Sequence, residues 1–351
     1  MYKYTHFINE NIAPVGAQKI GVYDENGKRV GGFSLGRLNP PTENKLYSFC
    51  ALSDIHLTYD TANADFQRAL TYAENSDCVF TCICGDLTST GSESELSQYK
   101  SIVATYAPTK PVHAMAGNHE NYSTKSQTYL ENYTGQPLYY SFTSGNDVFI
   151  MLGHYGGYGG DGIGWRPSEF LSTNEVQWLY ETLEANRNKR CFVFLHGFPQ
   201  GHDVGNANNL YTTAIIWKAT DGGIGEAVVN LLKHYKNTIL FHGHSHLRFS
   251  LQELDKKANY SEANGYRSVH IPSLSVPRDL TADGTKLEYV YAESEGYIVD
   301  VYEDCIVLNG RDFIDNDNDG NWLPIATYKI DTTLQPIEAN TFTDPTGTIT
   351  T

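Results

Sequence analysis

Two histidines separated by one serine, His244 and His246, follow a short apolar segment at 237–240. The segment has the composition of a β-strand, and side chains two positions apart on an extended chain lie on the same side. Neutral imidazole is the commonest metal ligand in proteins, and Gly243 before the pair lets the chain turn tightly. A polar turn after a buried strand explains a single pair of this kind equally well, so the pair alone does not establish a metal site.

Four earlier segments repeat this arrangement, because each is an apolar run of strand length that ends in a residue type able to bind metal. The runs and the residues after them are 46–53 before Asp54 and His56, 78–84 before Asp86, 111–116 before Asn118, His119 and Glu120, and 191–195 before His196. In α/β folds, sites lie beyond the carboxyl ends of the strands. Five strand ends that supply Asp, His and Asn therefore predict one mixed nitrogen and oxygen metal site.

The order of these motifs resembles that of the calcineurin-like metallophosphoesterases. The motifs are Asp54-x-His56, Gly85-Asp86, Gly117-Asn118-His119-Glu120, His196 and Gly243-His244-Ser245-His246. The ordered set is far more specific than any one of its members. The resemblance implies an α/β fold in which helices flank two mixed β-sheets in a four-layer αββα sandwich.

The resemblance also implies a dinuclear centre whose ions lie roughly 3.5–4 Å apart. The residues implied for one ion are Asp54, His56, Asp86 and His246, and those for the other are Asp86, Asn118, His196 and His244. Asp86 would bridge the ions, because a carboxylate has two oxygens and a negative charge that offsets cation repulsion. Mixed ligation of this kind fits Mn, Fe, Zn, Ni or Co, and the sequence does not select one. Purple acid phosphatases lack a histidine at the position of His56, so their iron–tyrosinate site is not expected.

His119 belongs to neither implied ligand set. The resemblance assigns it as the general acid that protonates the leaving oxygen, while a hydroxide between the metals attacks phosphorus. Glu120 would orient His119 or stabilise its charge, and a purely structural role is the alternative for each residue. We expect a phosphohydrolase acting on a small phosphoester, with phosphodiesters favoured. The alternatives are a phosphomonoesterase for a nucleotide or phosphoprotein, and a non-catalytic metal-binding scaffold, which is less favoured because no ligand is missing.

The segments between the strand-like runs predict helices that hold the runs in place. An apolar face at 62–74 indicates one helix, and capping boxes at Ser92–Glu95 and Ser172–Glu175 begin two more. A fourth helix is expected over 225–235. Further strands are expected at 138–142 and 147–152, and the strand-like segments 268–271, 288–291, 296–302 and 305–308 would complete a second, more antiparallel sheet.

The catalytic domain is expected to span residues 46–331. Before it, residues 1–45 predict a β-hairpin extension, because Asn26-Gly27 is a strong turn signal. After it, residues 332–351 read as a polar tail. The sequence does not decide the roles of the glycine-rich loop 153–164, of His154, of His202, or of the Asp315–Gly320 turn, which resembles the start of an EF-hand loop but has Ala326 at the twelfth position.

Composition limits the partners of the 351-residue chain. Its formal net charge of −16 argues against an extended nucleic-acid interface and against binding to an anionic membrane. It has no apolar run long enough to span a bilayer and no apolar signal-peptide core at its start, so we expect a cytoplasmic protein unless an export signal has been removed. Cys50, Cys82, Cys84 and Cys191 lie in predicted buried strands, which favours free thiols over disulfides.

Overall fold

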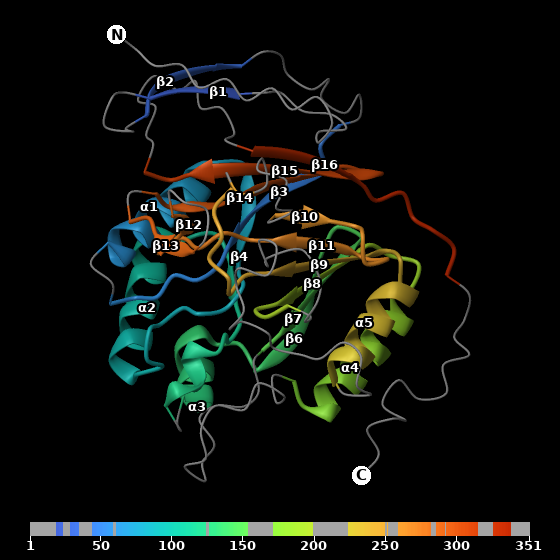
Figure 1. The fold of residues 1–351 in the computed structure, drawn as a ribbon. Helices are drawn as coiled ribbons and strands as arrows, with labels where there is room; N and C mark the ends of the chain where they lie inside the picture. Colours follow the sequence, from blue (N-terminus) through green and yellow to red (C-terminus); the bar gives the residue numbers. More distant parts are fainter. Residues whose placement is uncertain are drawn as a thin grey trace.

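Apolar residues at nearly every position of the central strands are explained by burial on both faces. The structure is a computed structural model, which describes residues 19–23, 29–34, 44–58, 61–123, 126–153, 171–198, 224–249, 251, 259–281, 286–291, 293–314 and 326–337. Within these ranges two six-stranded sheets face each other and helices cover their outer faces (Figure 1). This is the predicted four-layer αββα sandwich.

The first sheet has the strand order β16-β15-β14-β3-β4-β5. Strands β3, β4 and β5 are parallel, and β14 joins β3 in antiparallel orientation, followed by β15 and β16. The bounds are β3 Tyr47–Leu52, β4 Cys78–Ile83, β5 Val112–Ala114, β14 Glu295–Val301, β15 Cys305–Asp312 and β16 Ala326–Asp331.

The second sheet has the strand order β10-β11-β9-β8-β7-β6. Strands β7, β8, β9 and β11 are parallel, whereas β6 and β10 pair antiparallel at the two edges. The bounds are β6 Tyr139–Ser144, β7 Asp147–Leu152, β8 Cys191–Leu195, β9 Thr238–His242, β10 Tyr260–Ser261 and β11 Arg267–His270. Two smaller pairs are β1 Lys19–Tyr23 with β2 Arg29–Ser34, and β12 Arg278–Leu280 with β13 Leu287–Tyr289.

Helices pack on the outer face of each sheet (Figure 1). The first sheet is covered by α1 Ala62–Asn75 and α2 Glu93–Tyr106, and the second by α4 Thr173–Ala185 and α5 Ile224–His234. The predicted capping box of α2 is present, because the Ser92 hydroxyl accepts from the Glu95 N–H and the Glu95 carboxylate accepts from the Ser92 N–H. Two further elements, the 3₁₀ turn η1 His119–Tyr122 and α3 Ser126–Thr134, were not predicted. Within the described ranges, none of the helices has the length and apolar composition needed to cross a membrane.

Alternate residues of β3 pack into two different hydrophobic cores. Phe49 faces the second sheet, where its ring centroid lies 5.2 Å from that of Phe149 and 5.6 Å from that of Phe192. Cys50 and Leu52 point the other way, into the core under α1 and α2. A shift of one residue in this strand would exchange the two faces, so the packing of both layers fixes the register. All six cysteines are buried and free, as predicted for those in strands.

The last strands do not complete the second sheet as the sequence predicts. Strands β14, β15 and β16 instead extend the first sheet, because β14 pairs with β3. Among the described strands that follow β9, β10 and β11 alone join the second sheet, and β13 pairs with β12 outside both sheets. Strand pairing over about 250 residues of chain depends on which apolar face remains uncovered, and local composition does not report it.

The predicted terminal regions are only partly described. Strands β1 and β2 pair antiparallel, in agreement with the predicted hairpin, and the domain boundaries at 45 and 331 remain predictions. The first residue of the predicted polar tail, Thr332, is buried, and its hydroxyl accepts a hydrogen bond of 2.7 Å from Arg190. The hairpin turn at 24–28 and the 315–320 turn lie outside the described residues.

Arg190 joins the two sheets at the end remote from the strand ends that carry the motifs. Its guanidinium donates two hydrogen bonds, of 3.0 and 2.7 Å, to the carboxylate of Asp147 at the start of β7. It also donates to the Tyr302 carbonyl, which follows β14 in the first sheet. Because Arg190 and Asp147 are both buried, removal of one leaves the other charge without its partner.

Replacement of Arg190 by Ala should therefore lower the free energy of unfolding by roughly 3–5 kcal/mol in urea denaturation. Arg187→Ala is the matched control, because Arg187 pairs with Glu184 at the partly exposed surface and should cost about 1 kcal/mol or less. Equal losses in the two variants would show that Arg190 does not hold the sheets together.

Candidate metal centre

The carboxyl ends of β3, β4, β8 and β9 bring six predicted ligands together at one edge of the two sheets. The side chains form two groups, within each of which the ligand atoms lie within 4.8 Å of one another. The first group is Asp54, His56, Asp86 and His246, and the second is Asp86, His196 and His244. Asp86 belongs to both groups, and every member is buried.

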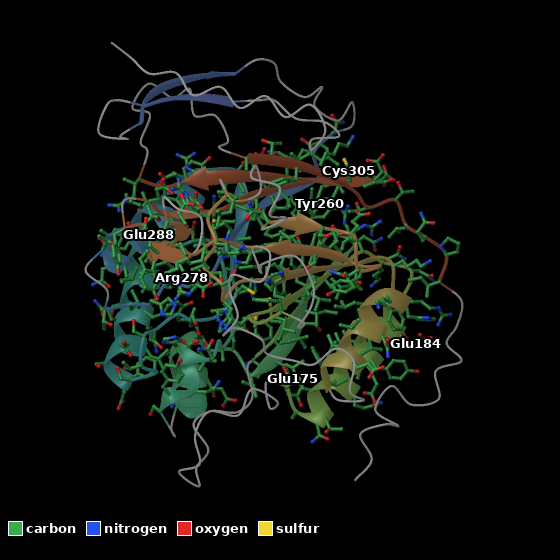
Figure 2. The ribbon with its side chains drawn as sticks, viewed as in Figure 1. Glu175, Glu184, Tyr260, Arg278, Glu288 and Cys305 are labelled. Carbon is green, nitrogen blue, oxygen red and sulfur yellow. The ribbon has the colours of Figure 1, made fainter. Side chains whose placement is uncertain are left out.

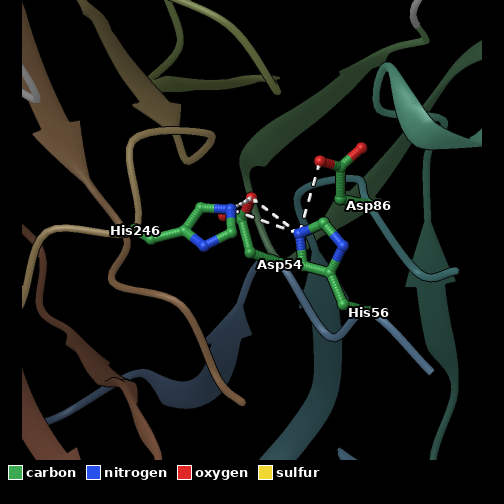
Figure 3. Close-up of side chains that lie close together, drawn as sticks. All are labelled: Asp54, His56, Asp86 and His246. Carbon is green, nitrogen blue, oxygen red and sulfur yellow. Dashed lines mark hydrogen bonds and ion pairs between the residues drawn. The ribbon is translucent and has the colours of Figure 1, made fainter. Parts of the chain in front are cut away.

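Figure 3 shows the first group, in which the four side chains point toward one another. The Nε2 atom of His246 lies 3.1 Å from Oδ1 of Asp54 and 3.2 Å from Nε2 of His56. His56 Nε2 in turn lies 3.6 Å from Oδ2 of Asp86. Nitrogen and oxygen atoms thus converge on a small volume from three separate motifs.

The second group uses the same oxygen of Asp86. His196 Nε2 lies 3.0 Å from Asp86 Oδ2, and His244 Nδ1 lies 3.2 Å from His196 Nε2. His196 Nε2 is also 3.7 Å from Asp54 Oδ1. The two groups are therefore adjacent, and one carboxylate lies between them.

The other oxygens of the two carboxylates are held by hydrogen bonds. Asp54 Oδ2 accepts from the Ser53 hydroxyl at 2.6 Å and from the His244 N–H at 2.9 Å. Asp86 Oδ1 accepts from the His119 N–H at 2.9 Å. In contrast, Asp54 Oδ1, Asp86 Oδ2 and the amide oxygen of Asn118 are buried and accept no hydrogen bond from any described residue. Buried oxygens without donors are costly, and a bound cation would satisfy them.

Backbone carbonyls orient two of the histidine rings. His196 Nδ1 lies 2.6 Å from the Cys84 carbonyl, and His246 Nδ1 lies 3.1 Å from the Val276 carbonyl. A protonated Nδ1 donates in each case and leaves the lone pair of Nε2 directed at the carboxylates. This is the arrangement that metal-bound histidines normally show.

The charges of the site are strongly coupled. Burial opposes ionisation of Asp54 and Asp86, but neighbouring histidines outweigh it and hold the pKa of both carboxyls well below the usual range. Burial lowers the pKa of His196, yet Asp86 and Asp54 raise it to about 10. Burial lowers the pKa of His56 to about 4, so this ring is neutral and keeps a lone pair. Without a metal, a proton on Nε2 of His196 would balance this negative charge, and a bound cation would displace that proton and take up the nitrogen lone pair.

Backbone strain is concentrated at the same residues. Six non-glycine residues within the described ranges have positive φ, and five of them are predicted ligands: Asp54, His56, Asp86, His244 and His246. Such conformations cost of order 1–3 kcal/mol each and cluster at functional sites, where the surrounding structure imposes them. The sharp turns direct the side chains of consecutive motif residues into one volume.

Two motif glycines lie where a larger residue would displace a ligand. A Cβ atom on Gly117 would lie 2.2 Å from Asp86 Oδ1, and one on Gly243 would lie 2.5 Å from Asp54 Oδ2. Gly117 and Gly243 are therefore explained by their close approach to a carboxylate of the site.

His119 and Asn118 lie at the edge of the ligand cluster, beside Tyr122. His119 Nε2 is 3.9 Å from Asp86 Oδ2 and 3.4 Å from the Tyr122 hydroxyl, and the Asn118 amide donates to that hydroxyl at 3.1 Å. Both oxygens of the Glu120 side chain bind groups other than the His119 ring. Its carboxylate accepts hydrogen bonds from Thr88 and from the Gly117 N–H, at 2.7–2.9 Å.

Sequence reasoning missed three residues that support or border the site. Ser53 binds Asp54, and its place directly before that ligand was the only local signal. His270 ends β11 and lies 2.8 Å from the Ser245 hydroxyl, so the rule that strand ends supply site residues could have found it. Tyr289 has no motif, yet its ring lies 6.5 Å from that of His246. His154, His202 and most of the loops 153–164 and 197–213 lie outside the described residues.

The close approach at Gly243 yields a test of the site. Gly243→Ala should displace Asp54 and lower the metal content of purified protein, measured by elemental analysis after supplementation with Mn or Zn. Gly265→Ala is the control for general destabilisation, because its φ of +82° strains an alanine although the Cβ would meet only Lys233, at 3.7 Å. An unchanged metal content in Gly243→Ala would contradict a ligand role for Asp54.

Comparison with solved structures shows the same fold in proteins of low sequence identity. A dimetal phosphatase from Danio rerio superposes with a TM-score of 0.58 at 14% identity, over 83% of this chain and 100% of that chain. A purple acid phosphatase from yellow lupin seeds gives 0.55 at 13% identity, over 89% of this chain and 59% of that chain. GAP50, the anchor in the inner membrane complex of Plasmodium, gives 0.54 at 11% identity, over 87% and 93%.

The sequence itself matches a family but no individual curated protein. The family model described as calcineurin-like phosphoesterase matches residues 47–248, which contain all five motifs and every candidate ligand. The chain therefore belongs to the calcineurin-like phosphoesterase family.

Proposed function

We propose that residues 46–331 form a phosphohydrolase that uses a dinuclear metal centre to cleave phosphodiesters. The observation that most supports a dinuclear centre is the position of Asp86. Its Oδ2 atom is shared by the two ligand groups and accepts no hydrogen bond from a described residue. A single ion would need only one of the two ligand groups. The side chains of both groups are buried and converge, which supports two ions.

In this proposal, Asp54, His56, Asp86 and His246 hold one ion, and Asp86, His196 and His244 hold the other. Asn118, whose buried amide oxygen accepts no hydrogen bond from a described residue, completes the second set. When bound, the metal ions lower the pKa of water to supply a nucleophile and neutralise charge on phosphate oxygens. The protein holds the carboxylates through Ser53, the His244 N–H and the His119 N–H, so these oxygens do not reorganise during the reaction. Mn, Fe, Zn, Ni and Co all suit the donor set.

His119 is the proposed general acid. Its Nδ1 lies 2.7 Å from the Ser89 carbonyl, which accepts from Nδ1–H and fixes the ring. Nε2 faces the site, 3.9 Å from Oδ2 of Asp86. The side chain is 22% exposed, whereas those of His56 and His196 are 2% and 0% exposed. His119 can therefore reach a leaving oxygen that arrives from solvent, and its Nε2–H would be donated to that oxygen.

We propose that Glu120 positions the site rather than contacting the substrate. It binds the Gly117 N–H on one side and both the N–H and hydroxyl of Thr88 on the other. Through these bonds it links the turn that carries Asn118 and His119 to the turn after Asp86. We therefore propose that Glu120 acts by positioning His119 and Asn118.

Two other functions fit the family. A phosphomonoesterase would use the same residues, and esters that share one leaving group distinguish it from a phosphodiesterase. The second alternative is a scaffold protein without turnover, and one protein of similar fold, GAP50, is described as an anchor. The buried oxygens and strained turns favour a site that binds metal for chemistry over a fold kept for its surface.

His119→Ala should retain its metal and lose turnover of an alkyl phosphodiester by roughly 10²–10⁴-fold. The loss should shrink for a nitrophenyl ester, because nitrophenolate departs almost without protonation. Metal content and steady-state rates on both esters measure the two effects, with His234→Ala, at the end of α5, as the control histidine. Loss of metal together with activity, or an equal loss on both esters, would contradict the acid role.

A further inference from the structure

Exposed tyrosines lie beside the metal centre. Among the described residues only six large apolar side chains are strongly exposed, and three of them are Tyr122 (39%), Tyr289 (44%) and Tyr291 (51%). Tyr122 contacts the proposed acid, and Tyr289 lies near a proposed ligand. Exposed aromatic surface grouped at one place is typical of a binding site.

The rings form a row that runs through the centre. The ring centroid of Tyr122 lies 4.4 Å from that of His119, which lies 4.5 Å from that of His56. His56 is followed by His246 at 4.9 Å. The proposed acid is therefore near one end of the row, and the histidines of the first ligand group lie in its middle.

Tyrosines of the β12–β13 pair extend this succession of neighbouring rings beyond His246. Tyr289 lies 6.5 Å from His246, and Tyr291 lies 5.9 Å from Tyr289, both measured between ring centroids. The row thus has an exposed tyrosine beside the acid at one end and two exposed tyrosines at the opposite end.

Arg278 fixes this second end to the metal centre. Its N–H donates a 2.7 Å hydrogen bond to the His246 carbonyl, so β12 is attached to the ligand turn. Its guanidinium donates to the Tyr289 hydroxyl and lies 4.6 Å from the centre of the Tyr289 ring. Figure 2 shows Arg278 and Glu288 on this two-stranded sheet. The Tyr289 ring is therefore held in place while much of its surface is open to solvent.

The position of the proposed acid in the row predicts which part of the substrate lies at each end. His119 must lie beside the oxygen that leaves, so the leaving group occupies the Tyr122 end. The opposite end, beyond His246, then faces the group that remains on phosphorus. A monoester has no such group, whereas a phosphodiester has one.

We propose that Tyr289 and Tyr291, with Arg278, bind a planar aromatic ring in the retained group of a phosphodiester. The inference rests on the proposed phosphohydrolase function and specifies its substrate class. Tyrosine faces stack on planar rings of any identity, and the adjacent guanidinium adds a cation that stacks on π systems and attracts the anionic diester. The ring could belong to a nucleobase or to another aryl group, because both offer the same stacking surface.

The test compares diesters that share nitrophenolate as leaving group and differ only in the retained group. 4-Nitrophenyl phenyl phosphate carries a planar ring, and 4-nitrophenyl cyclohexyl phosphate carries an apolar ring that is not planar. In each reaction the P–O bond to nitrophenolate breaks and the other substituent stays on the phosphate product. A third diester with thymidine as the retained group distinguishes a nucleobase from a simple aryl ring.

The measured quantity is the phenyl-to-cyclohexyl ratio of kcat/KM in wild type divided by the same ratio in Tyr289→Ala. This double ratio cancels the difference in intrinsic reactivity between the two esters. We expect the double ratio to be about five, because the loss of one aromatic contact changes binding by about this factor. Tyr289→Phe should keep most of the wild-type ratio, and Tyr291→Ala should lower it. Leu334→Ala removes an equally exposed apolar side chain elsewhere and should leave all rates unchanged.

The possible outcomes distinguish failure of the aromatic subsite from failure of the proposed phosphohydrolase function. A double ratio near one, with all diesters hydrolysed, would overturn the aromatic subsite and leave the phosphohydrolase function standing. A larger double ratio for the thymidine ester than for the phenyl ester would assign the subsite to a nucleobase. No turnover of any diester by metal-loaded wild type would overturn the proposed phosphodiesterase function and the subsite with it. If Tyr289→Ala fails to fold, Tyr289→Leu keeps the apolar bulk without the ring and gives the same test.

Discussion

Two buried carboxylates of one sheet draw much of their countercharge from the facing sheet. Asp54 and Asp86 follow β3 and β4 of the first sheet, whereas His196, His244 and His246 follow β8 and β9 of the second. Burial alone would favour neutral carboxyls, and the histidines reverse that preference. The phenylalanine core between the sheets holds the two strand edges together, and the positive-φ turns at the ligands persist because that packing imposes them.

The cluster of candidate ligands could be predicted from sequence because each of its members is encoded locally. A strand-length apolar run followed by Asp, Asn or His needs no knowledge of distant residues, and parallel strands bring such ends to one edge. The sheet to which β14, β15 and β16 belong could not be predicted, because β14 pairs with β3 about 250 residues earlier. The same holds for Thr332, whose contact with Arg190 fixes the start of a segment that reads as a polar tail.

The residues around the candidate ligands are harder to identify from the sequence. Ser53 and His270 are common residue types whose roles depend on a hydrogen bond to one atom of a motif. Tyr289 is one of 25 tyrosines, and only the position of β12–β13 beside His246 distinguishes it. Family membership and the ligand cluster indicate the fold and a metal site, whereas substrate choice depends on elements outside the motifs. The described side chains at the two ends of the histidine row are therefore where specificity can be sought.

If the shared carboxylate of Asp86 organises two metal ions for phosphoester hydrolysis, turnover must depend on both ions. This dependence can be measured by titrating metal-free protein with Mn²⁺ and following bound metal and nitrophenyl ester turnover in the same samples. We expect about two ions per chain, with turnover that rises as the second ion binds and disappears on chelation. Turnover that persists in metal-free protein, or full occupancy by two ions without hydrolysis of any ester, would show that Asp86 does not organise a hydrolytic centre.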